Sequence, residues 1–284
     1  MPARRCTWSA TESGAGSPAG RCLLFLDFDG VVCDSERECF VSSWLTYREL
    51  CGPGILPERI SLQSRRRFRD LRPLIRSGED YVVIQDILAR EAAQPGYRGP
   101  ASQDAFDACR RTLGAKRIAT YKRAMAATRD RYLQRDKESW LALNRIYPHM
   151  QALLAGADLD NVRILSTKAA PLVCEILRAH AIPLPDAAVF HAASNPNGAD
   201  TRKLDMIAAQ LDAVPGTHAL FVEDQLDHLL DNEDARIATF LADWGYVLPH
   251  WLGQADHLLR QGVQVIDSPR MAALFQRATG RVSG

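Results

Sequence analysis

Short apolar runs that end in polar or acidic residues recur along this chain, and helical patterns follow them. The runs have the length of strands, and the segments between the later runs are long enough for the helical crossover that parallel strands require. This alternation is continuous from about Tyr147 onward and predicts a parallel α/β sheet. The expected strands are Cys22–Leu26, Val162–Leu165, Ala188–Phe190, His218–Val222 and Ile237–Ala242, and the expected helices are Pro171–His180, Thr201–Leu211 and Gln225–Asn232.

The segment between the first two expected strands has a different pattern. From about Arg37 to Arg145 it contains no convincing strand and much helical periodicity. We therefore expect an all-α insertion at 37–145, an α/β core formed by 21–36 and 146–284, and a flexible tail at 1–20. Two apolar stripes predict helices of this insertion. One consists of Ile118, Tyr121, Met125, Thr128 and Tyr132, and the other, before a Gly-Pro-Gly break, consists of Phe40, Trp44, Tyr47 and Leu50.

Charge divides the chain along the same lines. Residues 37–140 hold 21 basic and 13 acidic side chains, and the remainder holds 14 basic and 21 acidic, so that the whole chain has a net charge of +1. A basic insertion beside an acidic body would attract an anionic substrate, although arginine-rich helices are as often simply solvated. The near-neutral total argues against a globally basic nucleic-acid-binding protein.

The remaining composition is that of an ordinary folded protein, with 46% hydrophobic and 24% charged residues. No stretch approaches the roughly 18 consecutive apolar residues of a membrane-spanning helix, and no apolar segment of a secretory signal follows Arg4 and Arg5. The seven cysteines include no C-x-x-C pair, which favours reduced thiols, argues against a zinc site and predicts a cytoplasmic protein.

Two carboxylates directly follow the first expected strand, in the order Asp27-Phe28-Asp29-Gly30. Carboxylates at the end of a buried strand are costly unless they are paired or bind a metal. Ligand sites of open parallel sheets form at the carboxyl ends of the strands, so chemistry is expected here. Residues two apart point the same way in an extended chain, and Gly30 permits a tight turn, so both carboxyl groups can approach one reacting centre.

This segment, continued as Val31-Val32-Cys33-Asp34-Ser35, resembles the first motif of the haloacid dehalogenase-like (HAD) superfamily. Two further motifs of that superfamily follow in the expected order. The second strand ends in Ser166-Thr167, which is similar to the second motif, with Ser166 at the hydroxyl position and Thr167 as the alternative if the register differs by one residue. Lys203 matches the lysine of the third motif, and Arg202 is its rival.

The fourth expected strand ends in an acidic segment that resembles the fourth, metal-binding motif. Asp224 matches the metal-binding acid, while Glu223 stands where Gly or Asp is usual, and Asp227 follows Asp224 more closely than the second acid of the family does. The assignment of Asp227 and Glu223 therefore stays open, and among the histidines only His228 adjoins this segment. Trp244-Gly245-Tyr246 after the fifth strand is similar to a W-G-Y segment common in the family.

The resemblance implies a Rossmann-like parallel sheet core with an inserted all-α cap of the C1 type. It also implies a Mg²⁺-dependent phosphatase that hydrolyses a small phosphate monoester, such as a phosphorylated metabolite, through an aspartyl-phosphate intermediate. The implied roles are nucleophile for Asp27, general acid and then base for Asp29, phosphate binding for Ser166, Thr167 and Lys203, and metal binding for the carboxylates of Asp27 and Asp224 and the backbone carbonyl of Asp29.

Two alternatives stay open at this point. A phosphomutase would share the same four motifs, whereas a phosphonatase is less favoured because no lysine of the cap can be nominated. A non-catalytic scaffold that binds nucleic acid is suggested by a basic cluster with an interleaved aromatic residue, although an intact motif set argues against it. That cluster consists of Arg65, Arg66, Arg67, Phe68 and Arg69.

Overall fold

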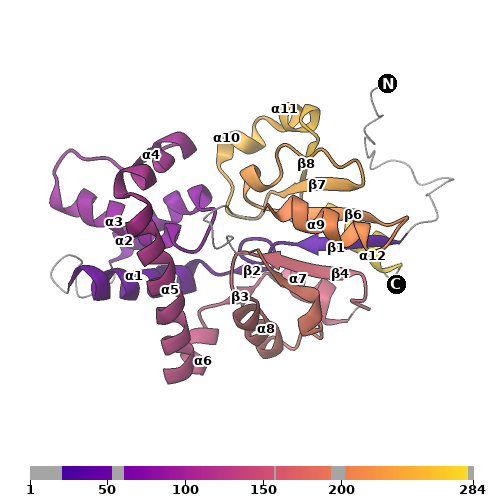
Figure 1. Ribbon diagram of the computed structural model, residues 1–284, viewed down its shortest axis with the longest axis horizontal. Helices are drawn as coiled ribbons and strands as arrows, with labels where there is room; N and C mark the ends of the chain where they lie inside the picture. The colour runs from indigo at the N-terminus through magenta and orange to yellow at the C-terminus, as the bar shows by residue number, and fades with distance from the viewer. Residues whose placement is uncertain (1–20, 53–60, 157, 193–201, 281–284) are drawn as a thin grey trace. The chain divides into compact units, whose positions relative to one another are not determined.

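Six parallel strands form the sheet that positions the candidate site, in the order β5-β4-β1-β6-β7-β8 (Figure 1). The structure is a computed structural model, and it describes residues 21–52, 61–156, 158–192 and 202–280. The prediction of a parallel α/β sheet is confirmed, and the tail expected at 1–20 lies outside the described residues. The strands are β1 (Cys22–Leu26), β4 (Val162–Ser166), β5 (Val189–His191), β6 (His218–Glu223), β7 (Ile237–Ala242) and β8 (Val263–Ile266).

Helices cover both faces of this sheet (Figure 1). On β1, Leu23 and Phe25 point to the face where residues of α9, α10 and α11 complete a buried cluster, so Leu24 and Leu26 point to the other face. On that second face α12 packs against β1 and α7, and α8 packs against β5. The helices are α7 (Pro148–Ala155), α8 (Ala170–Ala179), α9 (Lys203–Asp212), α10 (Pro249–Leu252), α11 (Ala255–Arg260) and α12 (Ser268–Thr279).

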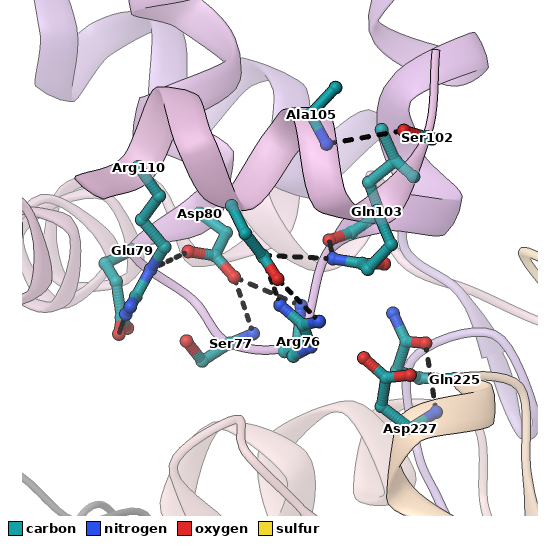
Figure 2. Close-up of polar contacts among 12 residues, drawn as sticks. Arg76, Ser77, Glu79, Asp80, Ser102, Gln103, Ala105, Arg110, Gln225 and Asp227 are labelled. Atoms are coloured by element: carbon teal, nitrogen blue, oxygen red, sulfur yellow. Dashed lines mark hydrogen bonds and ion pairs between the residues drawn. The ribbon is translucent and has the colours of Figure 1, made fainter. Parts of the chain in front are cut away.

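The helix expected at Gln225–Asn232 is wrong. This segment forms a single 3₁₀ turn, η3 (Leu226–His228), in which the side chain of Gln225 accepts a hydrogen bond from the backbone N–H of Asp227 (Figure 2). Asp231 then adopts a positive φ of 56°, which is incompatible with continuing a right-handed helix. The apolar spacing of this stretch suits a helix, but one turn of 3₁₀ geometry satisfies it equally well.

Residues Asp34–Arg145 form a second unit, separate from the α/β unit made of Met1–Cys33 and Ile146–Gly284. In this helical unit α1 packs against α3 and α5. The chain enters and leaves it through the two short strands β2 (Cys33–Asp34) and β3 (Arg145–Ile146), which form a two-stranded sheet. Its helices are α1 (Glu36–Cys51), α2 (Leu62–Leu71), α3 (Asp80–Ala93), α4 (Gln103–Leu113), α5 (Ala115–Arg135) and α6 (Lys137–Leu141).

The apolar stripes predict the core of the helical unit only in part, since Trp44, Ile118 and Tyr132 are only partly buried. Tyr121, Met125 and Thr128 of α5 are buried, as are Phe40 and Tyr47 of α1, whereas Leu50 at the end of the α1 stripe is 39% exposed. Leu50 lies in the last turn of α1, which ends at Cys51 and is followed by Gly52. A stripe predicts burial only as far as a neighbouring element covers it.

Many basic side chains of the helical unit have carboxylate partners within it. Arg65 and Arg69 of the basic cluster both contact Glu36, and Arg67 contacts Glu91. Elsewhere in the unit, Figure 2 shows the buried carboxylate of Asp80 held by the backbone N–H groups of Arg76 and Ser77 and by the guanidinium of Arg110. Much of the excess positive charge near α2 is therefore balanced locally.

No helix among the described residues combines the length and the apolar character needed to cross a membrane.

Candidate active site

Polar residues lie at or directly after the ends of three neighbouring strands of the sheet. Asp27 directly follows β1, while Ser166 and Glu223 are the last residues of β4 and β6, the two strands that pair with β1. The three strands are parallel, so their carboxyl ends meet at one edge of the sheet. The side chains of all three residues are buried.

Lys203 joins two of these strand ends. Its ammonium Nζ lies 2.8 Å from Asp27 Oδ1 and 2.6 Å from Glu223 Oε2, and the residue is only 4% exposed. Lys203 is the first residue of α9, which packs against β6 and β7. Its rival Arg202 instead donates hydrogen bonds to backbone carbonyls of Leu230 and Asp231, so the geometry brings Lys203 and not Arg202 to Asp27.

Glu223 is the most completely enclosed acid of the site. Its Oε1 accepts hydrogen bonds from the backbone N–H groups of Asp224 and Gln225, and its Oε2 contacts Lys203 Nζ and, at 3.1 Å, His228 Nδ1. A glycine at this position would leave Lys203 with one carboxylate partner instead of two. The His228 contact is made possible by the 3₁₀ turn η3, which returns the chain toward the end of β6.

These contacts distribute the charge of the site unevenly. Burial and then the proximity of Glu223 raise the pKa of Asp27 to about 8, although Lys203 acts in the opposite direction. Burial alone would also raise the pKa of Glu223, but Lys203 and His228 outweigh it and lower that pKa well below its usual value. Burial would lower the pKa of Lys203, yet Asp27 and Glu223 raise it above its usual value. One ammonium thus serves two acids, and Asp27 ionises less readily than an ordinary aspartate as a result.

Asp224 fits between two glycines. A Cβ added at Gly30 would lie 1.9 Å from Asp224 Oδ2, and one added at Gly245 would lie 2.4 Å from Asp224 Cβ. The backbone N–H of Tyr246 donates to Asp224 Oδ2 at 2.8 Å, and the indole N–H of Trp244 donates to the carbonyl of Val31. The Trp244-Gly245-Tyr246 segment therefore fixes both the Asp224 carboxylate and the loop after β1.

The acidic residues here suit a hard divalent cation. One carboxylate oxygen from each of Asp27, Glu223 and Asp224 lies within 4.8 Å of the other two, and all three residues are buried. Clustered carboxylate oxygens are the ligands that Mg²⁺ prefers, and a bound cation would favour the ionised form of Asp27. Asp227 lies outside this group of three and is exposed.

Asp29 lies on the turn that follows β1. The carbonyl of Phe28 accepts hydrogen bonds from the backbone N–H groups of Val32 and Cys33, and Gly30 has a φ of +99° that favours glycine. Asp29 is 8% exposed, and its Oδ1 lies 2.9 Å from the ammonium of Lys168. The sequence did not single out Lys168, because nothing in Ser166-Thr167-Lys168 indicates which way the lysine points.

Ser166 and Thr167 differ in their surroundings. The Ser166 side chain is buried at the end of β4, where its Oγ accepts a hydrogen bond from the backbone N–H of Lys168 at 3.1 Å. A hydroxyl that accepts one hydrogen bond keeps its own O–H to donate, which is what a phosphoryl oxygen requires. Thr167 is half-buried.

Replacing Gly30 with alanine is expected to displace Asp224 and to destabilise the protein. The methyl group would meet Asp224 Oδ2 and, at 2.7 Å, the ring of Tyr246, in addition to the cost of a positive φ. We expect a loss of about 2–4 kcal/mol in the free energy of unfolding, measured by chemical denaturation.

Gly262→Ala is the matched control for Gly30→Ala. Gly262 has a similar φ of +92° but nothing within 4 Å of an added Cβ, so that variant pays the backbone cost alone. Equal destabilisation by the two substitutions would contradict a steric role of Gly30 in holding Asp224.

Comparison with known proteins identifies the fold. No protein-family model matches the chain, and no curated protein sequence matches it. Among solved structures, a predicted phosphoglycolate phosphatase from Haemophilus somnus matches with a TM-score of 0.55 at 16% identity, over 89% of this chain and 97% of that one. A haloacid dehalogenase-like family protein from Streptococcus pneumoniae matches with a TM-score of 0.50 at 17% identity, over 90% of this chain and 98% of that one. The chain therefore has the HAD-like fold.

Proposed function

We propose that this protein is a Mg²⁺-dependent phosphatase that hydrolyses a small phosphate monoester through an aspartyl-phosphate formed on Asp27. The observation that carries the proposal is the buried contact of Lys203 with both Asp27 and Glu223, next to Asp224, at the carboxyl ends of the central strands. The fold agrees with it, since solved structures of the same fold include proteins described as phosphatases.

Asp27 acts as the nucleophile in the first step. One of its carboxylate oxygens attacks phosphorus, a new P–O bond forms, and the bond from phosphorus to the leaving oxygen breaks. The ammonium of Lys203, 2.8 Å from Asp27 Oδ1, reduces the repulsion between the carboxylate and the anionic phosphoryl group. The Ser166 hydroxyl donates a hydrogen bond to a phosphoryl oxygen, and Thr167 is a further candidate for phosphate binding.

Asp29 transfers protons in both steps, the departure of the leaving group and the hydrolysis of the aspartyl-phosphate. As an acid it protonates the leaving oxygen of the ester, and as a carboxylate it then removes a proton from the water that attacks the phosphorus of the intermediate. Hydrolysis releases inorganic phosphate and returns Asp27 as a free carboxylate. An acid at this position favours phosphoryl transfer over dehalogenation, which needs no such group.

The metal ligands of this proposal are the carboxylates of Asp27 and Asp224 and the backbone carbonyl of Asp29. A bound Mg²⁺ neutralises negative charge on the phosphoryl group and on the clustered carboxylates. Glu223, whose two oxygens already accept hydrogen bonds, acts mainly on Lys203. The helical unit Asp34–Arg145 is proposed as the cap that selects the small phosphorylated substrate.

The test is release of inorganic phosphate from a panel of phosphate monoesters by purified protein, with Mg²⁺ or with EDTA. We expect turnover with Mg²⁺ and a loss of more than about 100-fold in EDTA that added Mg²⁺ reverses. A second readout needs no turnover. Mg²⁺ at about 100 times its dissociation constant should stabilise the protein by about 2.7 kcal/mol, and Asp224→Asn should abolish that stabilisation.

The outcomes separate the competing functions. Transfer of phosphate within a sugar phosphate, without release, would replace the phosphatase by a phosphomutase. Absence of any turnover by folded protein that Mg²⁺ does stabilise would overturn the catalytic proposal while leaving the metal site intact.

A further inference from the structure

A second buried lysine lies at the site, and the mechanism above does not use it. Lys168 follows β4 by two residues, and its side chain has no exposed surface. Its ammonium lies 2.9 Å from Asp29 Oδ1 and 5.7 Å from the centre of the Phe28 ring. Burial of an ammonium is costly unless partners compensate it, so the burial of Lys168 at this site calls for an explanation.

The contacts of Lys168 connect two parts of the site. Through its backbone N–H, Lys168 donates to the Oγ of Ser166, and through its side chain it contacts Asp29. The residue therefore links the hydroxyl at the end of β4 to the carboxylate on the turn after β1. A carboxyl group is planar, so a contact at one of its oxygens also fixes the direction of the other.

We propose that Lys168 is a positioning residue that orients the Asp29 carboxyl group for proton transfer to the leaving oxygen. This inference rests on the proposed function. Proton transfer requires the acid within hydrogen-bond distance of the leaving oxygen, and a carboxylate on a turn can rotate away unless another group holds it. The Phe28 ring also contacts the Lys168 ammonium through a cation–π interaction.

The proposal predicts a dependence on the leaving group. An ester with a strongly basic leaving oxygen needs the proton from Asp29, whereas p-nitrophenolate leaves readily without it. Loss of the Asp29 orientation should therefore slow cleavage of phenyl phosphate far more than cleavage of p-nitrophenyl phosphate. A residue that merely supports the fold would slow both reactions by the same factor.

The experiment compares kcat/KM for these two esters in the wild type, Lys168→Met and Asp29→Asn. The ratio kcat/KM reports the steps up to departure of the leaving group, so it isolates the acid step from the later attack of water. We expect Lys168→Met to lower kcat/KM for phenyl phosphate about tenfold or more beyond its effect on p-nitrophenyl phosphate. In the double variant the second substitution should add little, because Asp29→Asn has already removed the acid.

Two further variants complete the experiment, one as a control at another cation and one as a substitute for Lys168→Met. Arg163→Met removes a cation from β4 whose guanidinium donates to the backbone carbonyls of Asp160 and Val162, and it should leave the ratio between the two esters unchanged. Lys168→Gln keeps a side-chain N–H and the approximate length, and it serves in place of Lys168→Met if the methionine variant does not fold.

Three results would overturn the proposal. Equal losses on both esters would assign Lys168 a structural role, and a rise in KM alone, equal for both, would assign it to phosphate binding. Additive effects of Lys168→Met and Asp29→Asn would show that the two side chains act independently. Failure of the proposed function is distinct, because the wild type would then cleave neither ester.

Discussion

Asp27→Asn is expected to abolish phosphate release, with a loss of about 1,000-fold or more, and to leave the protein at least as stable as the wild type. The amide has the shape of the carboxylate but is not a nucleophile toward phosphorus. It also replaces an ionisable carboxyl group by a neutral amide in a buried group of three acids, of which Lys203 contacts Asp27 and Glu223. Lys203 also lies 2.6 Å from Glu223, and we expect the variant to retain this contact.

The two readouts of this prediction are phosphate release with Mg²⁺ and thermal unfolding in EDTA. The matched control is Asp256→Asn, an exposed carboxylate in the first turn of α11, which should change neither. Retention of more than a tenth of the activity by Asp27→Asn would remove Asp27 as the nucleophile. A large fall in the melting temperature of Asp27→Asn would instead assign the carboxylate a structural role.

The sequence predicted the central sheet because its strands are buried on both faces. Such strands are continuous apolar runs, and the expected bounds Cys22–Leu26 and Ile237–Ala242 are those of β1 and β7. Edge strand β8 was missed because Gln264 interrupts its apolar pattern and only its two ends are buried. The 3₁₀ turn after β6 was mistaken for a helix because apolar spacing alone does not report the positive φ of Asp231.

The candidate site was predictable where a residue's place follows from the strand that precedes it. Asp27, Ser166 and Asp224 all lie at or just after strand ends, and parallel strands bring such residues together. Contacts made by long side chains were not predictable in this way. The reach of Lys168 to Asp29, and the double engagement of Lys203, depend on side-chain directions that only the packed structure fixes.

The contacts of Glu223 were likewise not predictable from the sequence. Its departure from the usual motif was visible in the sequence, but its partners were not. The structure surrounds its carboxylate with Lys203, His228 and two backbone N–H groups, which makes it a partner of the lysine as much as a member of the acidic group. A carboxylate with this many donors is well stabilised despite its complete burial.

Lys203→Met should be the most destabilising single change at the site. It leaves the buried carboxylates of Asp27 and Glu223 without the ammonium that lies 2.8 Å and 2.6 Å from them. Removing one partner of a buried ion pair costs about 3–5 kcal/mol, which in a chain of this size lowers the melting temperature by roughly 10 °C. Phosphate release should fall by about 100-fold or more, since the variant also loses a cation next to the phosphoryl group.

A second substitution separates the loss of stability in Lys203→Met from its loss of phosphate release. In Lys203→Met/Glu223→Gln one of the stranded carboxylates becomes a neutral amide, so part of the lost stability should return while activity stays low. Stability is measured by chemical denaturation in EDTA, and Lys116→Met, an exposed lysine of α5, is the control. If Lys203→Met unfolds at the same denaturant concentration as the wild type, the ammonium does not hold the two carboxylates together. Because Glu223→Gln repairs only the charge imbalance, recovery of stability without activity would show that Lys203 acts on the phosphoryl group as well as on its carboxylate neighbours.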